Sequence, residues 1–260
     1  MNTTALITGA SSGIGYEFAR IFAENHHNVV LVARNEQTLS SLAEELRSKH
    51  GIVAIVLPKD LAKFSAAKEI TAELQTKSIH VDILVNNAGL GSHGLFAEMD
   101  LGMIEQMMQV NMVALTQLTK LLLPAMLKNR SGKICNVAST ASFQPGPLMA
   151  VYYATKAYVL WLSEALANEL NGTGVSVTAL CPGPTESDFQ RRAGMEKSHL
   201  FDSGVMDSAS VARVGYSALM KGKTTVIPGI RNKLLAQSVR IGPRKMVTSI
   251  VRNLQANRQK

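Results

Sequence analysis

Two adjacent tyrosines and a lysine stand close together in the stretch YYATK, residues 152–156. Lys156 follows Tyr152 by four residues and Tyr153 by three, and on a helix both spacings bring side chains together. A free tyrosine has a pKa near about 10, which is too high for proton transfer at neutral pH. One cation about 4 Å away supplies roughly 4 kcal/mol, enough to lower that pKa by about 3 units. The stretch fits acid–base catalysis, and an aromatic helix face beside a solvated lysine is the alternative.

A glycine-rich loop, TGASSGIG, covers residues 8–15 between an apolar run and a helical pattern. Gly9 permits a tight turn, Gly13 lets a diphosphate approach the backbone, and Gly15 allows close packing of helix on strand. The following helix N-terminus offers free N–H groups and a positive dipole end to phosphates. Because the loop follows the first expected strand, it predicts a dinucleotide site.

The second apolar run ends in LVARNE, where a reader of the ribose 2′-hydroxyl would need an acidic residue near Ala33. Arg34 stands there instead, and a guanidinium suits the two charges of a 2′-phosphate. This favours NADP over NAD. A solvated charge at a strand end is the other interpretation of Arg34.

Apolar runs alternate with helical patterns along the chain, and the runs lack the polar alternation of a half-exposed sheet. We expect strands over 4–9, 28–34, 52–58, 81–87, 132–139, 175–183 and 224–228, with helices over about 64–77, 100–128 and 152–170 among those between them. This order predicts an α/β, doubly wound Rossmann fold with a central, mostly parallel seven-stranded sheet flanked by helices. We expect one domain over 1–260, with a substrate loop at about 186–210 and a basic amphipathic extension at about 231–260.

The net charge of +8 is unevenly distributed over the 260 residues. Residues 208–260 hold 11 Lys/Arg and no acidic residue, whereas residues 1–207 hold 16 Lys/Arg and 19 Asp/Glu. Near the end, one helical face carries Met246, Val247, Ile250, Val251 and Leu254. Docking on the domain or on a second subunit, weak contact with a membrane surface, attraction of an anionic substrate and a plain solvated face all remain open.

The two cysteines, Cys135 and Cys181, lie inside apolar runs, so we expect no disulfide framework and a reducing, cytoplasmic compartment. No basic-then-apolar secretory segment opens the chain. The six histidines and two cysteines form no cluster with metal-ligand spacing, which disfavours a zinc-dependent alcohol dehydrogenase. The basic tail contains no recognisable nucleic-acid-binding module, so we expect no nucleic-acid partner.

Further motifs follow the glycine loop in order: NNAG at 86–89, Asn111, Ser139, YYATK and CPG at 181–183. Together they resemble the short-chain dehydrogenase/reductase family over roughly residues 3–230. That family's pattern of Tyr, three residues and Lys, with Ser 13 positions before the tyrosine, selects Tyr152 and Ser139. Tyr153 would then serve packing or a subunit contact.

The resemblance implies a catalytic set and a cofactor site. The catalytic residues would be Asn111, Ser139, Tyr152 and Lys156. Asn111 would anchor a water that links Lys156 to solvent; an amide that braces the helix is the alternative. The cofactor would be NADP(H), held by Gly9, Ser11, Ser12, Gly13, Ile14, Gly15, Arg34, Asp60, Leu61, Asn87, Ala88, Gly89, Tyr152, Lys156, Pro182, Gly183 and Thr185. The chain departs from the family twice: Ser12 stands where some NADP users carry a basic residue, and Ser187 could share the nicotinamide contact with Thr185.

The implied activity is hydride transfer between the nicotinamide and a carbonyl or alcohol substrate. Segments 90–98, 140–149 and 186–206 would face the substrate, and their apolar residues favour an apolar ketone, aldehyde or ketoacyl compound. These residues are Leu95, Phe96, Phe143, Leu148, Met149, Phe189 and Met195, and ordinary loop packing is the alternative. A homodimer or homotetramer is implied by the family. Two rival functions are a catalytically idle dinucleotide-binding sensor or scaffold, and a peripheral membrane protein that uses the basic tail.

Overall fold

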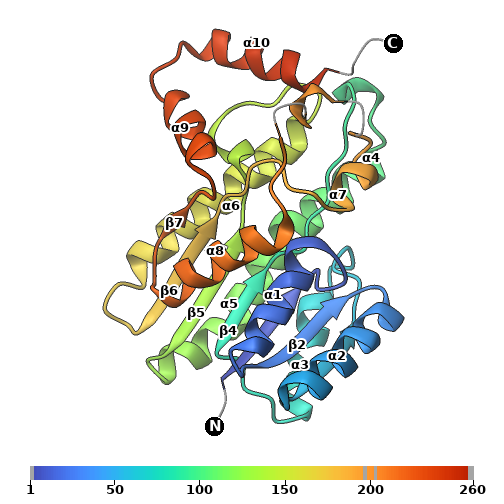
Figure 1. Ribbon diagram of the computed structural model, residues 1–260, viewed down its shortest axis with the longest axis vertical. Coiled ribbons are helices and arrows are strands. Elements are labelled where there is room, and N and C mark those ends of the chain that lie inside the picture. Colours follow the sequence, from blue (N-terminus) through green and yellow to red (C-terminus); the bar gives the residue numbers. More distant parts are fainter. Residues whose placement is uncertain (1–2, 196–197, 202–203, 257–260) are drawn as a thin grey trace.

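Seven parallel strands form one sheet in the order β3-β2-β1-β4-β5-β6-β7 (Figure 1). The computed structural model describes residues 3–195, 198–201 and 204–256. Positions 196–197 and 202–203 of the expected substrate loop, and 257–260 of the expected extension, lie outside the described residues. The strands are β1 (Thr4–Thr8), β2 (Asn28–Ala33), β3 (Ala54–Pro58), β4 (Ile83–Asn86), β5 (Gly132–Val137), β6 (Val175–Leu180) and β7 (Thr225–Val226).

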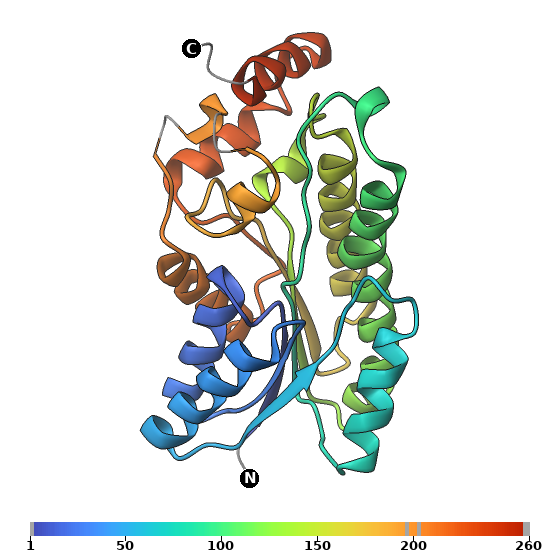
Figure 2. The ribbon, with the colours of Figure 1, turned by 90° about the vertical axis from the view of Figure 1, so that its right-hand side faces the viewer.

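Helices cover both faces of the sheet, so the predicted doubly wound Rossmann fold is confirmed (Figure 2). One face packs against α1 (Gly13–Glu24), α2 (Glu36–His50) and α8 (Ser208–Met220). The other packs against α3 (Ala66–Thr76), α5 (Leu115–Lys128) and α6 (Ala150–Glu169). The strand interiors are almost entirely buried, because apolar layers lie on both sides of them.

The segment expected as a substrate loop at 186–210 is shorter in the structure, because α8 begins at Ser208. The side chain of Asp207 caps that helix and accepts a hydrogen bond of 2.7 Å from the backbone N–H of Ser210. The sequence pattern did not predict α8. Before it, the segment forms the short helices α7 (Phe189–Arg192) and η4 (His199–Phe201).

The expected helical region at 100–128 is one continuous stretch, Leu101–Lys128, preceded by the single turn η1 (Phe96–Glu98). It consists of α4 (Leu101–Met108), the π-helical segment η2 (Gln109–Ala114) and α5. By length and composition alone this stretch could cross a membrane. However, Met107, Leu118 and Met126 are fully buried, so it serves as a core helix of the α/β fold.

A buried polar network fixes α6 against the sheet. The amide of Asn86 donates to Thr119 Oγ1 and to Asn136 Oδ1, at 3.1 and 2.9 Å. Asn136 in turn donates to Ser163 Oγ at 2.9 Å, on α6. Since buried polar groups are costly unless they are paired, this chain of bonds fixes the position of the helix that carries the two tyrosines.

The chain ends in α9 (Ile230–Ser238) and α10 (Arg244–Gln255), which lie at the top of the molecule, far from the N-terminus (Figure 1). The expected amphipathic helix after Gly242 and Pro243 is therefore present as α10. A short turn, η3 (Thr140–Phe143), follows β5 and contacts both α6 and α9.

Candidate active site

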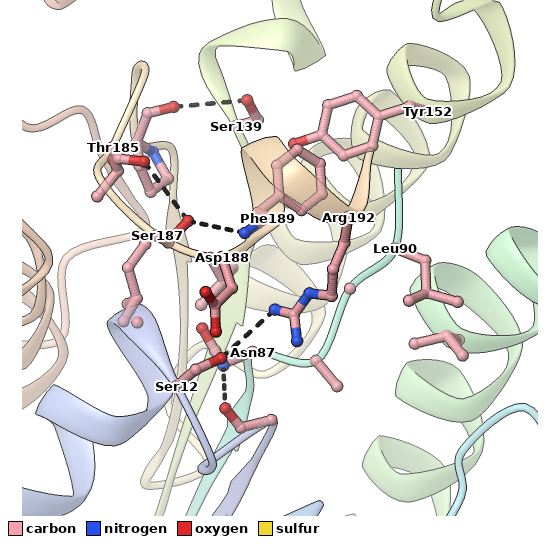
Figure 3. A pocket seen from close by; sticks show the side chains of 18 of the residues that line it. Ser12, Asn87, Leu90, Ser139, Tyr152, Thr185, Ser187, Asp188, Phe189 and Arg192 are labelled. Atoms are coloured by element: carbon pink, nitrogen blue, oxygen red, sulfur yellow. Dashed lines mark hydrogen bonds between the residues drawn. The ribbon is translucent and has the colours of Figure 1, made fainter. Parts of the chain in front are cut away.

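A cavity of about 550 Å³ opens at the carboxyl ends of the strands, where the strand order reverses between β1 and β4. Every expected catalytic and cofactor-binding residue lines this cavity except Gly15 and Asn111. Figure 3 shows how Ser12, Asn87, Ser139, Tyr152 and Thr185 converge on it from separate elements. The volume lies within the range of small-molecule pockets, about 300–1,000 Å³.

The glycine loop has the geometry that a diphosphate requires. Gly9 and Gly13 have φ of +67° and +56°, the left-handed region that favours glycine. A Cβ on Gly15 would lie 2.3 Å from both the carbonyl oxygen of Gly9 and the amide of Asn87, so this glycine permits the close packing of α1. Because α1 starts at Gly13, its first backbone N–H groups have no hydrogen-bond acceptor within the helix, and this end of the helix lies at the cavity. The loop therefore fits a dinucleotide.

Arg34, Asp60 and Leu61 line the end of the cavity that is expected to hold the adenosine, together with residues that the sequence analysis missed. Those residues are Asn35, Thr38 and Lys59. In the described part of the chain no acidic side chain pairs with the exposed Arg34, whereas Lys59 lies 3.3 Å from Glu73. Arg34 thus has its charge available for a 2′-phosphate.

Tyr152 and Tyr153 occupy different environments on α6. Tyr152 faces Ser139 and the cavity, and its ring packs 5.2 Å from that of Phe189 (Figure 3). Tyr153 is 6% exposed, and its hydroxyl accepts a hydrogen bond of 2.6 Å from Gln255 on α10. Tyr153 therefore packs within its own chain, against the C-terminal helix.

Burial raises the pKa of Tyr152 well above its usual range, and the side chain of Ser139 partly offsets this. The expected net lowering of this pKa was wrong, because burial raises it. Burial also lowers the pKa of Lys156, to about 8, and its Nζ lies 5.9 Å from the centroid of the Tyr152 ring. Lys156 Nζ donates to the carbonyl oxygen of Val137 at 2.7 Å, and this lysine is only 5% exposed. Desolvation outweighs the attraction, so Tyr152 carries its proton at neutral pH.

Asn111 lies in the π-helical segment η2, where π turns commonly mark functional positions. Its side-chain oxygen accepts from the N–H of Leu90, and its amide donates to Leu90 O and Thr155 Oγ1, at 2.8, 2.9 and 2.9 Å. Asn111 is thus a brace between the backbone at Leu90 and α6. The expected role in a water relay from Lys156 stays a prediction.

The loop after β6 forms the end of the cavity that is expected to hold the nicotinamide. Pro182, Gly183, Thr185 and Ser187 all line the cavity, consistent with a contact shared between Thr185 and Ser187. Thr185 Oγ1 donates to Gly183 O at 2.9 Å, which fixes the turn. The hydroxyls of Thr185 and Ser187 can each form a further hydrogen bond to a ligand.

The substrate end is lined by only three of the seven expected apolar residues, namely Met149, Phe189 and Met195. Leu95 and Phe96 are exposed instead, at 45% and 64%, and do not line the cavity. Phe143 and Leu148 do not line the cavity either.

The wall also contains Arg192 and Leu200 from the expected segment 186–206, and Gln255, which the sequence analysis missed. Arg192 donates across the cavity to Ser12 Oγ at 3.4 Å (Figure 3). Gln255 could not be found from local patterns, because it lies 102 residues from Tyr153. Arg192 places a cation beside the glycine loop, where the diphosphate would lie.

Comparison with known proteins identifies the same architecture. A model of the family described as short chain dehydrogenase matches residues 3–198. The ketoacyl reductase HetN of Nostoc sp. is 34% identical over 227 residues, which cover 86% of this chain and 77% of HetN.

Two solved structures are similar over nearly the whole chain. A short-chain dehydrogenase from Sphingobium yanoikuyae in complex with NADPH has a TM-score of 0.83 at 32% identity, with 98% of both chains covered. The bulky-bulky ketone specific alcohol dehydrogenase from Comamonas testosteroni has a TM-score of 0.78 at 31% identity, with 98% of this chain and 96% of that chain covered.

Proposed function

The chain belongs to the short-chain dehydrogenase family of oxidoreductases, which use nicotinamide cofactors, and we propose that it is an NADP(H)-dependent enzyme for apolar carbonyl or alcohol substrates. The observation that carries this proposal is the convergence of Ser139, Tyr152 and Lys156 on one cavity with the glycine loop. An idle sensor or scaffold would have no need of all three. Titration with NADPH and NADH, followed by a panel of carbonyl compounds, tests the proposal.

In the proposed reaction a bound nicotinamide dinucleotide supplies or takes the hydride. In carbonyl reduction Tyr152 would donate the proton of its Oη to the substrate oxygen, and a proton from solvent would restore the phenol; in alcohol oxidation the phenolate would accept the alcohol proton. Ser139 Oγ hydrogen-bonds to the same oxygen and stabilises its developing charge. Lys156 places a cation near Tyr152 and favours the deprotonated phenol as the proton leaves. Asn111 holds the Leu90 segment and α6 in place.

The proposed substrate is an apolar ketone or ketoacyl compound. Met149, Phe189 and Met195 supply an apolar wall, and the relatives include a ketoacyl reductase and a dehydrogenase of bulky ketones. Exclusive use of small charged sugars in the carbonyl panel would contradict this assignment and leave the oxidoreductase assignment intact.

Replacement of Arg34 by alanine is expected to lower kcat/KM for NADPH about 10- to 100-fold and to leave kcat/KM for NADH within about twofold. A charge-assisted contact with the 2′-phosphate contributes about 1.5–3 kcal/mol, and NADH lacks that group. Steady-state kinetics with both cofactors checks this. An equal loss with the two cofactors would show that Arg34 does not recognise the 2′-phosphate.

We also propose a homodimer or homotetramer in which the α5 and α6 faces meet. Trp161 on α6 is 72% exposed, and Tyr158 and Leu121 beside an apolar groove are 39% and 42% exposed. Substitution of Trp161 by glutamate is expected to shift the protein toward monomers, because it buries a charge in that contact. Light scattering measures the mass, and an unchanged mass would place the contact elsewhere.

We propose a cytoplasmic location, and the basis is again the two cysteines. Cys135 and Cys181 are free and buried, and burial raises the pKa of each thiol to about 12. Buried neutral thiols of this kind fit a reducing compartment.

A further inference from the structure

The surface formed by α9, α10 and the turn between them carries large apolar side chains in contact with solvent. We call it the α9–α10 surface, and Figures 1 and 2 show it at one end of the molecule. Six of its exposed side chains are Leu234, Leu235, Ile241, Met246, Ile250 and Leu254. Their exposed fractions range from 44% at Leu254 to 90% at Ile241. Single exposed apolar residues are ordinary, but a grouped set marks an interaction site.

The apolar stripe of α10 is wider than its docking on the chain requires. Val247 and Val251 pack in the cluster that contains Met195 and Tyr153. Met246, Ile250 and Leu254 recur at four-residue intervals along an adjacent stripe and are 53%, 50% and 44% exposed. One half of the apolar face is therefore used within the chain and the other half is free.

Charge distinguishes the occupants that could cover this surface. Residues 230–255, which make up the two helices and the turn, contain six Lys/Arg and no acidic residue. Arg240 and Lys245 are exposed beside Ile241 and Met246, so cations flank the apolar stripe. A symmetric contact with a second copy would place these cations against their own kind. An anionic lipid headgroup layer complements them, and the apolar side chains enter the acyl boundary beneath.

We propose that the α9–α10 surface binds the surface of an anionic lipid bilayer, with Ile241 and Ile250 inserted and the basic side chains at the headgroups. This placement brings the bilayer to the substrate end of the cavity. Gln255, the last residue of α10, lines that cavity, and its carbonyl oxygen lies 2.7 Å from His93 Nε2. An apolar substrate dissolved in the bilayer would then have a short path to the site, a consequence that rests on the proposed function.

Vesicle co-sedimentation of the full chain tests the surface. The probes are phosphatidylglycerol/phosphatidylcholine vesicles and pure phosphatidylcholine vesicles, at low and high salt. The triple variant Leu234→Ser, Ile241→Ser, Ile250→Ser removes apolar anchors, and Phe64→Ser, at a site 66% exposed, is the matched control outside this surface. We expect binding to the anionic vesicles only, weakened by salt, and reduced about tenfold or more in the triple variant alone.

Three results would overturn the proposal: no binding to anionic vesicles, equal binding to neutral vesicles, or full binding by the triple variant. Light scattering of the same proteins tests the alternative that a second copy of the chain covers this surface. If the wild-type protein does not bind vesicles and the triple variant has a lower mass than wild type, the surface is a contact between copies. NADPH oxidation without vesicles separates this proposal from the enzymatic one. A protein that oxidises NADPH but does not bind vesicles would overturn only the proposal of membrane binding. A protein that binds vesicles but does not oxidise NADPH would overturn only the proposed function.

Discussion

Replacement of Tyr152 by phenylalanine is expected to lower kcat about 10³-fold while NADPH binding stays within about twofold. Of the two tyrosines that line the cavity, Tyr152 is the one whose hydroxyl hydrogen-bonds to Ser139, and general acid catalysis contributes about 10²- to 10⁴-fold. Burial raises the pKa of Tyr152, so the wild-type residue is neutral at pH 7 and holds the proton that reduction needs. Steady-state kinetics and fluorescence titration with NADPH measure the two effects.

The matched control is Tyr153→Phe, which removes the same hydroxyl one position along α6. Its loss of turnover is expected to stay below about tenfold, because this hydroxyl contacts Gln255 at 2.6 Å and lies outside the proposed proton path. Wild-type turnover in Tyr152→Phe would refute the assigned role. A larger loss in Tyr153→Phe than in Tyr152→Phe would reverse the assignment of the two tyrosines.

Replacement of Lys156 by methionine is expected to lower kcat about 10²-fold or more and at the same time to stabilise the cofactor-free protein. The burial that lowers the pKa of Lys156 from 10.5 to about 8 corresponds to about 3 kcal/mol of folding free energy at pH 7. Methionine has a similar volume and needs no counter-charge, so the free energy of unfolding should rise by about 1–3 kcal/mol. Urea denaturation at pH 7 measures this gain.

The pH dependence of that gain has a definite sign. Between pH 8 and 10.5 the unfolded wild-type chain binds more protons at Lys156 than the folded chain does, so this lysine's contribution to stability rises with pH. The advantage of Lys156→Met should therefore be largest below pH 8 and shrink toward pH 10.5. Because the other titrating groups are common to both proteins, they cancel in the difference. A variant less stable than wild type at pH 7 would show that the lysine stabilises the fold.

The fold was predictable because strands and their order leave local signals. The buried strands β1, β2 and β4 each contain an unbroken run of at least three apolar residues, and the loop at Gly9 and Gly13 uses a residue type that its positive φ angles favour. Helix α8 was missed for a physical reason. Its buried face is built partly from Ala212, Gly215 and Ala218, whose small side chains give little periodic hydropathy.

Helix α8 can take its position only because a small residue lets it pack closely against neighbouring elements. A Cβ on Gly215 would lie 2.7 Å from both Leu180 and Phe18. These neighbours come from distant parts of the chain, so the reason for a small residue becomes visible only when β6 and α1 are in place.

The sequence alone determined which residue types stand where acid–base chemistry and dinucleotide binding need them. Spacing on a helix could not choose between Tyr152 and Tyr153, since both lie within one turn of Lys156. The family pattern selected Tyr152, and the tertiary structure supplies the physical difference: Gln255 of the C-terminal helix hydrogen-bonds to Tyr153, whereas Ser139 faces Tyr152. Tertiary structure also decided the direction of the pKa shifts of Tyr152 and Lys156. The spacing in the sequence sets how near the two side chains can come, but burial by remote segments sets the free-energy cost of ionising each of them.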